Sequence, residues 1–236
     1  MMTEYKNKVA LSKKIIYSAK NNGDFAISWS AGKDSTAMCH LIKSIFPETP
    51  IIIQFDDCDW PEKASYVKRI AKGQNWKYHA ITPNFSVWLE IVKGKMIYED
   101  FCSQSHRLTK NSFLSLLNKK REELGCNGFY LGLRAEESRA RKLNYIQRGS
   151  LYKLKRGEWR CCPISSWTVD DVFAYLVEND IEINPCYFNN ILRKPHEIRL
   201  SWALPLNNTR VLADVEHIKR YYPRQFQKLR EFMDEL

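Results

Sequence analysis

Residues 25–36 read FAISWSAGKDST, and this stretch decides the fold that we expect. An apolar run typical of a buried strand ends in a turn of small residues, and apolar positions then recur with helical spacing up to Ile45. Such a strand–turn–helix junction presents backbone N–H groups at the helix N-terminus, where the helix dipole also favours an anion. Gly32 allows a ligand to approach the backbone closely, and Lys33 supplies a positive charge. The stretch therefore predicts a phosphate-binding loop.

This loop is not a Walker A loop, because Ile27 stands where that motif has Gly, and Asp34 stands where it has Ser or Thr. It resembles instead the PP-loop, Ser-Gly-Gly-x-Asp-Ser, of the ATP pyrophosphatases (adenine nucleotide alpha hydrolases). The Lys in its middle makes it similar to the 3′-phosphoadenylylsulfate (PAPS) reductase-like branch of that superfamily. The loop departs from the pattern at Ala31, which replaces the first Gly.

A second signal lies at residues 128–141, which read GFYLGLRAEESRAR. A short apolar strand delivers several Arg residues at its end, and guanidinium groups bind phosphate or sulfate bidentately. The stretch resembles the family's Gly-x-Arg-x-x-Glu-Ser-x-x-Arg motif, whose fixed positions fall on Gly132, Arg134, Glu137, Ser138 and Arg141. The alternative is a helix start whose Arg and Glu side chains form salt bridges with one another.

Two further stretches are similar to the same family. Asp56 follows an apolar strand and, with residues 60–62, looks like the family's Asp-Thr-Gly…Phe-Pro-Glu segment. Acidic residues at that end of a parallel strand lie where open α/β sheets bind ligands, although here they could simply cap the next helix. Residues 163–187 resemble the family's Pro-Ile…Trp-Thr…Asn-Pro-x-Tyr pattern, and Thr168 is a good N-cap for a helix over 169–178.

The order of the patterns predicts an α/β fold with a three-layer, doubly wound, mainly parallel sheet of the Rossmann-like PP-loop type. We expect a nucleotide-binding domain over residues 1–190 and a basic, helical C-terminal extension over residues 191–236. Strands are expected at residues 25–29, 51–55, 77–81 and 128–131. Helices are expected at residues 3–20, 35–46, 62–72, 85–93, 107–124, 169–178 and 213–234, with a basic hairpin or loop at 145–160.

The resemblance implies a PP-loop enzyme of sulfur metabolism or adenylyl transfer. It would bind ATP or a related adenine nucleotide and cleave or transfer at the α–β phosphate bond, which activates an acceptor. The residues with implied catalytic roles are Lys33, Asp34 and Arg134. The implied nucleotide-binding residues are Ser28, Ser30, Gly32, Lys33, Asp34, Ser35, Thr36, Asp56, Gly132, Arg134, Glu137, Ser138, Arg139 and Arg141. Mg²⁺ is the expected metal, with Asp34 and Asp56 as its ligands.

The cysteines leave two alternative functions open. PAPS reductases carry a catalytic Cys in a Glu-Cys-Gly motif near the C-terminus, and no Cys follows Cys186 here. We therefore expect the reductase cysteine to be lacking, and the first alternative is a reductase that uses Cys102, Cys161 or Cys162 instead. The second is a non-catalytic nucleotide-sensing or nucleic-acid-binding protein. The chain has no Cys-x-x-Cys, which argues against an iron–sulfur cluster and a zinc knuckle.

Net charge and composition limit the kinds of partner that we expect. The chain of 236 residues has a formal net charge of +10, and residues 134–160 and 193–230 each hold nine Lys or Arg against three Asp or Glu. Nucleic acid is one candidate partner for this charge, and an ordinary solvated surface is the other. No apolar run approaches the length of a membrane span and no secretory signal is evident, so we expect a cytoplasmic protein.

Overall fold

Strand β1 (Phe25–Trp29) has parallel neighbours on both sides, which places the loop that follows it near the middle of a sheet. The other strands are β2 (Ile51–Gln54), β3 (Tyr78–Ile81), β4 (Gly128–Leu131), β5 (Leu151–Lys153) and β6 (Trp159–Cys161). Their order is β3-β2-β1-β4-β6-β5, and only the edge strand β5 runs antiparallel to its neighbour. In this register Ile27 lies between Ile51 and Tyr130.

The structure is a computed structural model that describes residues 2–56, 59–83, 105–188, 219–224, 226–227 and 230. Its contacts divide the chain into two compact units. The first comprises Met1–Gln54, Ser65–Ile81 and Asn118–Asn184 and holds the whole sheet, and the second comprises Phe55–Ala64, Thr82–Leu117 and Pro185–Leu236. The expected helix at 85–93 lies outside the described residues, as does most of the expected extension, so the boundary at residue 190 stays a prediction.

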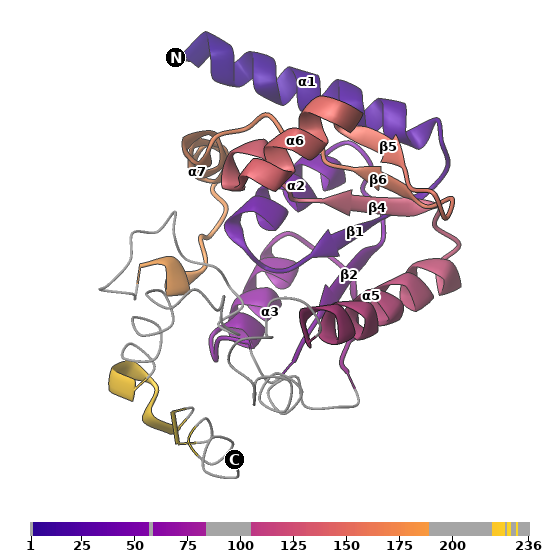
Figure 1. Cartoon of the computed structure of the whole chain (residues 1–236). Coiled ribbons are helices and arrows are strands. Elements are labelled where there is room, and N and C mark those ends of the chain that lie inside the picture. The colour runs from indigo at the N-terminus through magenta and orange to yellow at the C-terminus, as the bar shows by residue number, and fades with distance from the viewer. Residues whose placement is uncertain are drawn as a thin grey trace. The chain divides into compact units, whose positions relative to one another are not determined.

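Helices lie on both sides of the sheet, as Figure 1 shows. In the described part of the chain the α-helices are α1 (Met2–Lys20), α2 (Lys33–Lys43), α3 (Lys63–Gly73), α5 (Ser105–Glu123), α6 (Arg139–Arg148) and α7 (Val169–Glu178). The same part contains two short 3-10 helices, η1 (Ala135–Glu137) and η2 (Pro185–Tyr187). The predicted three-layer, mainly parallel class is thus confirmed. Among the described residues, no helix has the length and apolar character that crossing a membrane requires.

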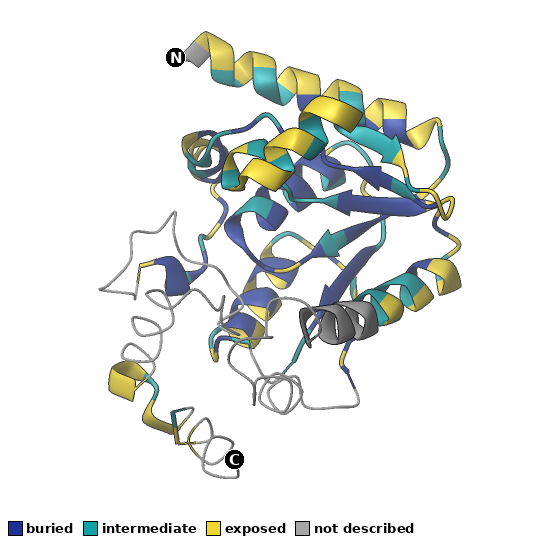
Figure 2. Ribbon diagram, in the orientation of Figure 1, coloured by how far each residue is buried: buried dark blue, intermediate teal, exposed yellow. Residues whose placement is uncertain are grey.

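The inner strands of the sheet are buried on both faces, because helices cover each side, whereas the edge strand β3 has exposed residues. All four residues of β2 are buried, and Figure 2 shows the inner strands in the colour of buried residues. This explains why β2 reads as a continuous apolar run rather than an alternating one. Helix α2 turns Ala37, Met38, Leu41 and Ile42 inward, and all four side chains are at most 1% exposed.

Most observed boundaries lie within two residues of the expected ones, and two stretches show why they differ. Helix α2 begins at Lys33 rather than at residue 35, because Gly32 is extended and its carbonyl accepts from the N–H of Thr36 at 2.8 Å. The hairpin or loop expected at residues 145–160 is a hairpin only in its later part, where β5 and β6 pair, because residues 145–148 are the end of helix α6, which was not expected. What the sequence did not reveal is that β6 also pairs in parallel with β4, since Arg160 interrupts its apolar character.

Buried hydrogen bonds hold helix α1 to the loop before α7. The Ser12 hydroxyl donates to the Pro163 carbonyl at 2.7 Å and accepts from the indole N–H of Trp167 at 2.9 Å. Trp167 is 1% exposed, and such a buried indole N–H needs a partner. At the start of α7, Thr168 and Asp171 form the reciprocal bonds of a capping box, so the predicted N-cap is confirmed.

Glycine at position 128 is required by the contact between β4 and β6. A Cβ atom there would lie 2.4 Å from the Trp159 carbonyl oxygen and 2.9 Å from the Phe25 ring. We expect Gly128→Ala to lower the free energy of unfolding by about 1–3 kcal/mol, because the clash involves backbone that cannot rotate away. Urea denaturation measures this change.

Gly73→Ala is the matched control, since a Cβ atom at Gly73 would meet nothing within 4 Å. At this helical position Ala should be neutral or stabilising by up to about 1 kcal/mol. Equal unfolding midpoints for both variants would contradict the pairing of β4 with β6.

Candidate functional site

The loop between β1 and α2 is braced by two serine hydroxyls. The Ser30 and Ser35 hydroxyl oxygens lie 2.9 Å apart, and the Ser35 oxygen also accepts from the N–H of Ser30 at 3.2 Å. Ser35 is only 5% exposed, and its hydroxyl lies 3.1 Å from the Gly32 carbonyl, to which it can donate. In this structure both hydroxyls that were predicted to contact phosphate close the loop upon itself.

Ala31 gives the loop its turn. Its φ angle of 62° lies in the left-handed region, which costs a residue with a Cβ atom about 1 kcal/mol and costs Gly nothing. The side chain is fully buried, so packing opposes any relaxation of the backbone. The substitution of Ala for the motif's first Gly therefore leaves a tight turn in place at a modest energetic cost.

The end of β4 lies directly against the first turn of α2. A Cβ atom on Gly132 would come within 2.7 Å of the Ser35 Cα and within 2.8 Å of its backbone nitrogen. Only a residue without a side chain allows this approach. The two strongest sequence signals, at residues 25–36 and 128–141, are thus brought together at one place.

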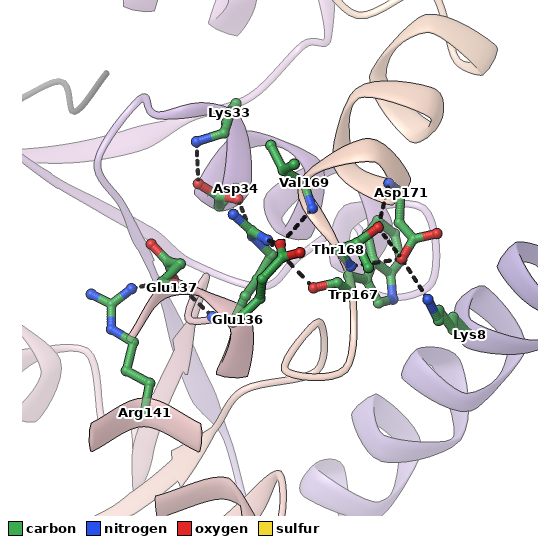
Figure 3. Close-up of polar contacts among 11 residues, drawn as sticks. Lys8, Lys33, Asp34, Glu136, Glu137, Arg141, Trp167, Thr168, Val169 and Asp171 are labelled. Carbon is green, nitrogen blue, oxygen red and sulfur yellow. Dashed lines mark hydrogen bonds and ion pairs between the residues drawn. The ribbon is translucent and has the colours of Figure 1, made fainter. Parts of the chain in front are cut away.

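The same contact forms a buried ion-pair network, shown in Figure 3. Asp34 accepts from the Nε of Arg134 at 2.6 Å through one carboxylate oxygen and from the Nζ of Lys33 at 3.0 Å through the other. Lys33 and Arg134 are 5% and 4% exposed. Burial disfavours the charged guanidinium, but Asp34, together with Glu136 and Glu137, outweighs burial and raises the pKa of Arg134. The network therefore places two basic side chains beside the N-terminus of a helix.

Glu136 links this network to α7. Its carboxylate accepts from a terminal nitrogen of Arg134 and, at 2.8 Å, from the N–H of Val169, the first residue of α7. The same Arg134 nitrogen lies 3.4 Å from the Trp167 carbonyl. Glu136 was assigned no role from the sequence, because the motif leaves that position open. The signal available in the sequence was an acidic residue two positions after the Arg of the motif.

The remaining residues of the second signal shape the turn that carries Arg134. Glu137 accepts from the backbone N–H of Arg134 at 2.9 Å and forms an ion pair with Arg141. Ser138 caps α6 by accepting from the N–H of Arg141 at 3.2 Å, and Arg139 is exposed at the first position of that helix. The alternative of a salt-bridged helix start is thus present, and a ligand role for these residues stays a prediction.

Three other residues that were predicted to bind the nucleotide lie outside the ion-pair network. Thr36 is fully buried and accepts from the indole N–H of Trp29 at 3.0 Å, so its hydroxyl faces the core. Ser28 lies within β1, opposite Ile52 and Leu131. Asp56 belongs to the second compact unit, where its N–H donates to the Asp59 carboxylate at 3.0 Å, and its nucleotide role stays a prediction.

Comparison with known proteins places this geometry in a family. Residues 24–194 match the phosphoadenosine phosphosulfate reductase domain. The chain belongs to this family. It is 21% identical over 188 residues to the phosphoadenosine 5′-phosphosulfate reductase of Vibrio cholerae, a match that covers 79% of this chain and 72% of the relative.

Solved structures share the fold. The phosphate complex of the PAPS reductase from Candida auris superposes with a TM-score of 0.55 at 16% identity, over 74% of this chain and 82% of the other. The FMN adenylyltransferase of Candida glabrata in complex with ATP gives a TM-score of 0.56 at 13% identity, over 81% of this chain and 61% of the other. At such identities the likeness is one of fold alone.

The described thiols of this PAPS reductase domain are buried. Cys161 is fully buried in β6 and Cys162, which follows it, is 5% exposed. Burial raises the pKa of Cys162 to about 11 and holds the pKa of Cys161 well above its ordinary value. Since the thiolate is the nucleophile, neither is poised to attack sulfur. Cys102 lies outside the described residues.

The described residues hold no preformed site for the predicted Mg²⁺. They contain no group of three or more His, Cys, Asp or Glu side chains placed to hold a metal ion. Asp34 uses both carboxylate oxygens on cationic side chains, so it would have to give up an ion pair to bind Mg²⁺. The predicted Mg²⁺ roles of Asp34 and Asp56 stay predictions.

Burial should make Cys161 and Cys162 slow to alkylate in the folded protein. With a pKa of about 11 instead of 9.0, Cys162 holds roughly one-hundredth of the usual thiolate fraction at pH 8. Its alkylation rate should keep rising with pH towards 11, whereas an ordinary thiol levels off near its own pKa. Iodoacetamide labelling followed by peptide mass spectrometry reads each cysteine separately, and unfolding in urea serves as the control. Rapid labelling of either residue at pH 8 in the native state would contradict the burial of these two thiols.

Proposed function

We propose that this protein binds ATP or a related adenylyl nucleotide at residues 30–36 and cleaves or transfers at the α–β phosphate bond to activate an acceptor. Membership of the PAPS reductase domain family supports a nucleotide ligand. The shared fold with an adenylyltransferase that was solved with ATP supports the same class of ligand. The observation that carries the proposal is the pair of buried cations, Lys33 and Arg134, at the start of α2.

The chemistry requires a site that stabilises a departing anion. An oxygen of the acceptor attacks the α-phosphorus, the bond between the α-phosphorus and its bridging oxygen breaks, and the adenylyl group passes to the acceptor as pyrophosphate leaves. Negative charge grows on the pyrophosphate as that bond breaks. Lys33, Arg134 and the first-turn N–H groups of α2 are fixed dipoles and charges of the sign needed to stabilise it.

Asp34 has a positioning role in this proposal. Its carboxylate holds Lys33 and Arg134 together before the nucleotide arrives, so their orientation costs little when the anion binds. Glu136 holds Arg134 from the other side through the N-terminus of α7. Without such carboxylates two buried cations would repel one another and destabilise the fold.

Reduction of a sulfonucleotide is the second candidate, because the family takes its name from that reaction. It needs a thiolate near the distal end of the nucleotide, and the described cysteines of this chain are buried. We therefore favour adenylyl chemistry over reduction. A purely nucleotide-sensing protein would bind the nucleotide without releasing pyrophosphate.

The charge of Lys33 should be needed for nucleotide binding. We expect Lys33→Met to weaken ATP binding by about tenfold or more, because a charge-assisted hydrogen bond contributes roughly 1.5–3 kcal/mol. Lys43→Met is the matched control, since Lys43 is the last residue of the same helix and the net charge changes equally. Isothermal titration calorimetry measures affinity, and a coupled assay measures pyrophosphate release. Equal affinities for the two variants would refute the site, whereas ATP binding without any pyrophosphate release would favour the sensing protein.

We also expect no release of sulfite from PAPS or adenylylsulfate when thioredoxin and a reductant are supplied. The buried thiols cannot reach the thiolate state at neutral pH in useful amounts. Sulfite is measured on the purified full chain, with nucleotide binding as the control for a folded site. Robust sulfite release that is abolished by Cys102→Ser, Cys161→Ser or Cys162→Ser would establish the reductase in place of our proposal.

A further inference from the structure

A groove with an apolar floor runs between α1 and α6, away from the ion-pair network. It has a volume of about 620 Å³, and Leu11, Ile15, Tyr145, Ile146 and Leu151 contribute its apolar walls. Figure 1 shows the two helices beside one another near β5, and Figure 2 shows that both carry exposed outer faces. The groove belongs entirely to the first compact unit.

Helix α1 carries more apolar surface than its own packing uses. Ile16 and Ala19 are fully buried on the face that packs against the rest of the unit. The groove is lined instead by Leu11, Lys14, Ile15 and Ser18, which share another face of the helix at i, i+3, i+4, i+7 spacing, and of which Leu11 and Ile15 are apolar. Leu11 on this face is 44% exposed. Helix α1 therefore presents two apolar side chains to the groove in addition to those that it buries in the core.

Helix α6 also carries exposed apolar side chains. None of its residues is buried. Ile146, which lines the groove, is 67% exposed, and Leu143 is 47% exposed. Ile146 and Leu11 line the same groove, so exposed apolar side chains from both helices border it. Exposed apolar surface of this kind, with a polar surround, marks interaction sites.

The two helices that border the groove are basic. Helix α1 has five Lys and one Glu, and α6 has four Lys or Arg and no acidic residue. Lys14 itself lines the groove. This net positive charge repels a second copy of the chain, which would bring the same charges to the same place. It attracts an acidic ligand, and the apolar floor selects one that also has an apolar face.

We propose that the α1–α6 groove binds an acidic, amphipathic helix of a partner protein. A helix can place its apolar anchors against Leu11 and Ile15, which lie one turn apart on α1, and against Ile146 on α6. Carboxylates on its outer face are attracted to Lys14 and to the net positive charge of the two helices, which speeds and orients the encounter. The apolar floor favours a protein helix over nucleic acid, because phosphate backbones would leave Leu11 and Ile146 uncovered.

Helix α6 connects the groove to the candidate site. Helix α6 continues directly from the turn of Arg134, and Arg141 in its first turn pairs with the carboxylate that caps that turn. Helix α6 thus joins the two places, since its first turn adjoins the turn of Arg134 and its C-terminal part lines the groove. The docking itself does not depend on that reaction.

The test uses a fluorescein-labelled synthetic helix of about 18 residues, with Leu at the i, i+3, i+4, i+7 positions and mainly Glu elsewhere. Fluorescence anisotropy with the full chain should show binding of this peptide. A scrambled peptide of the same composition, and a version with Lys in place of Glu, should not bind. Ile146→Glu should weaken binding by about tenfold or more, as the loss of a central apolar anchor does. Lys14→Glu should also weaken it.

Val177→Glu is the matched control, because Val177 on α7 is also 67% exposed but does not line the groove. It should leave the affinity unchanged, and circular dichroism confirms that each variant is folded. Absent binding, equal binding of the scrambled peptide, or equal effects of Ile146→Glu and Val177→Glu would overturn the proposal. So would tight binding of a labelled single-stranded RNA that Ile146→Glu abolishes, or dimerisation abolished by that variant. These outcomes do not depend on ATP, so the proposal can fail while the proposed function stands.

Discussion

The ion pair between Asp34 and Arg134 is the contact on which the candidate site depends. The two residues lie 100 positions apart in the sequence and meet because β1 and β4 are neighbours in the sheet. Gly132 permits the meeting by letting the end of β4 touch the first turn of α2. Because Arg134 is 4% exposed, its charge is tolerated only while its carboxylate partners remain in place. Loop, strand end and buried charges therefore form one structural unit.

The support for this unit extends outward in two steps. Glu136 joins Arg134 to the N-terminus of α7, and Trp167, just before that helix, is held by Ser12 of α1. Helix α1 precedes the loop between β1 and α2 in the chain, yet it contributes to the placement of Arg134 through these contacts. The face of α1 that lines the groove beside α6 takes no part in them, so a partner bound there as proposed would leave these contacts in place.

The charge and the burial of the side chains limit which reactions the site can support. The cations at the site are paired and buried, which suits an anionic ligand that replaces or extends those pairs. The described thiols are buried without a cation close enough to offset the loss of solvation, which suits packing rather than nucleophilic attack. The family name and the local chemistry thus point to the same nucleotide class but favour different reactions.

The sequence by itself determined the local features. The strand, turn and helix at residues 25–36, the cap at Thr168, and the importance of Gly132 and Arg134 could be read from apolar spacing, small residues and motif, because each reflects a preference of a short segment. Tertiary structure alone decided the partners. That Ser30 and Ser35 bond to one another, that Thr36 serves Trp29, and that β6 lies beside β4 follow from strand order and from the depth of each side chain. Neither quantity is encoded in local periodicity, since burial and ion pairing depend on which distant segments the sheet brings into contact.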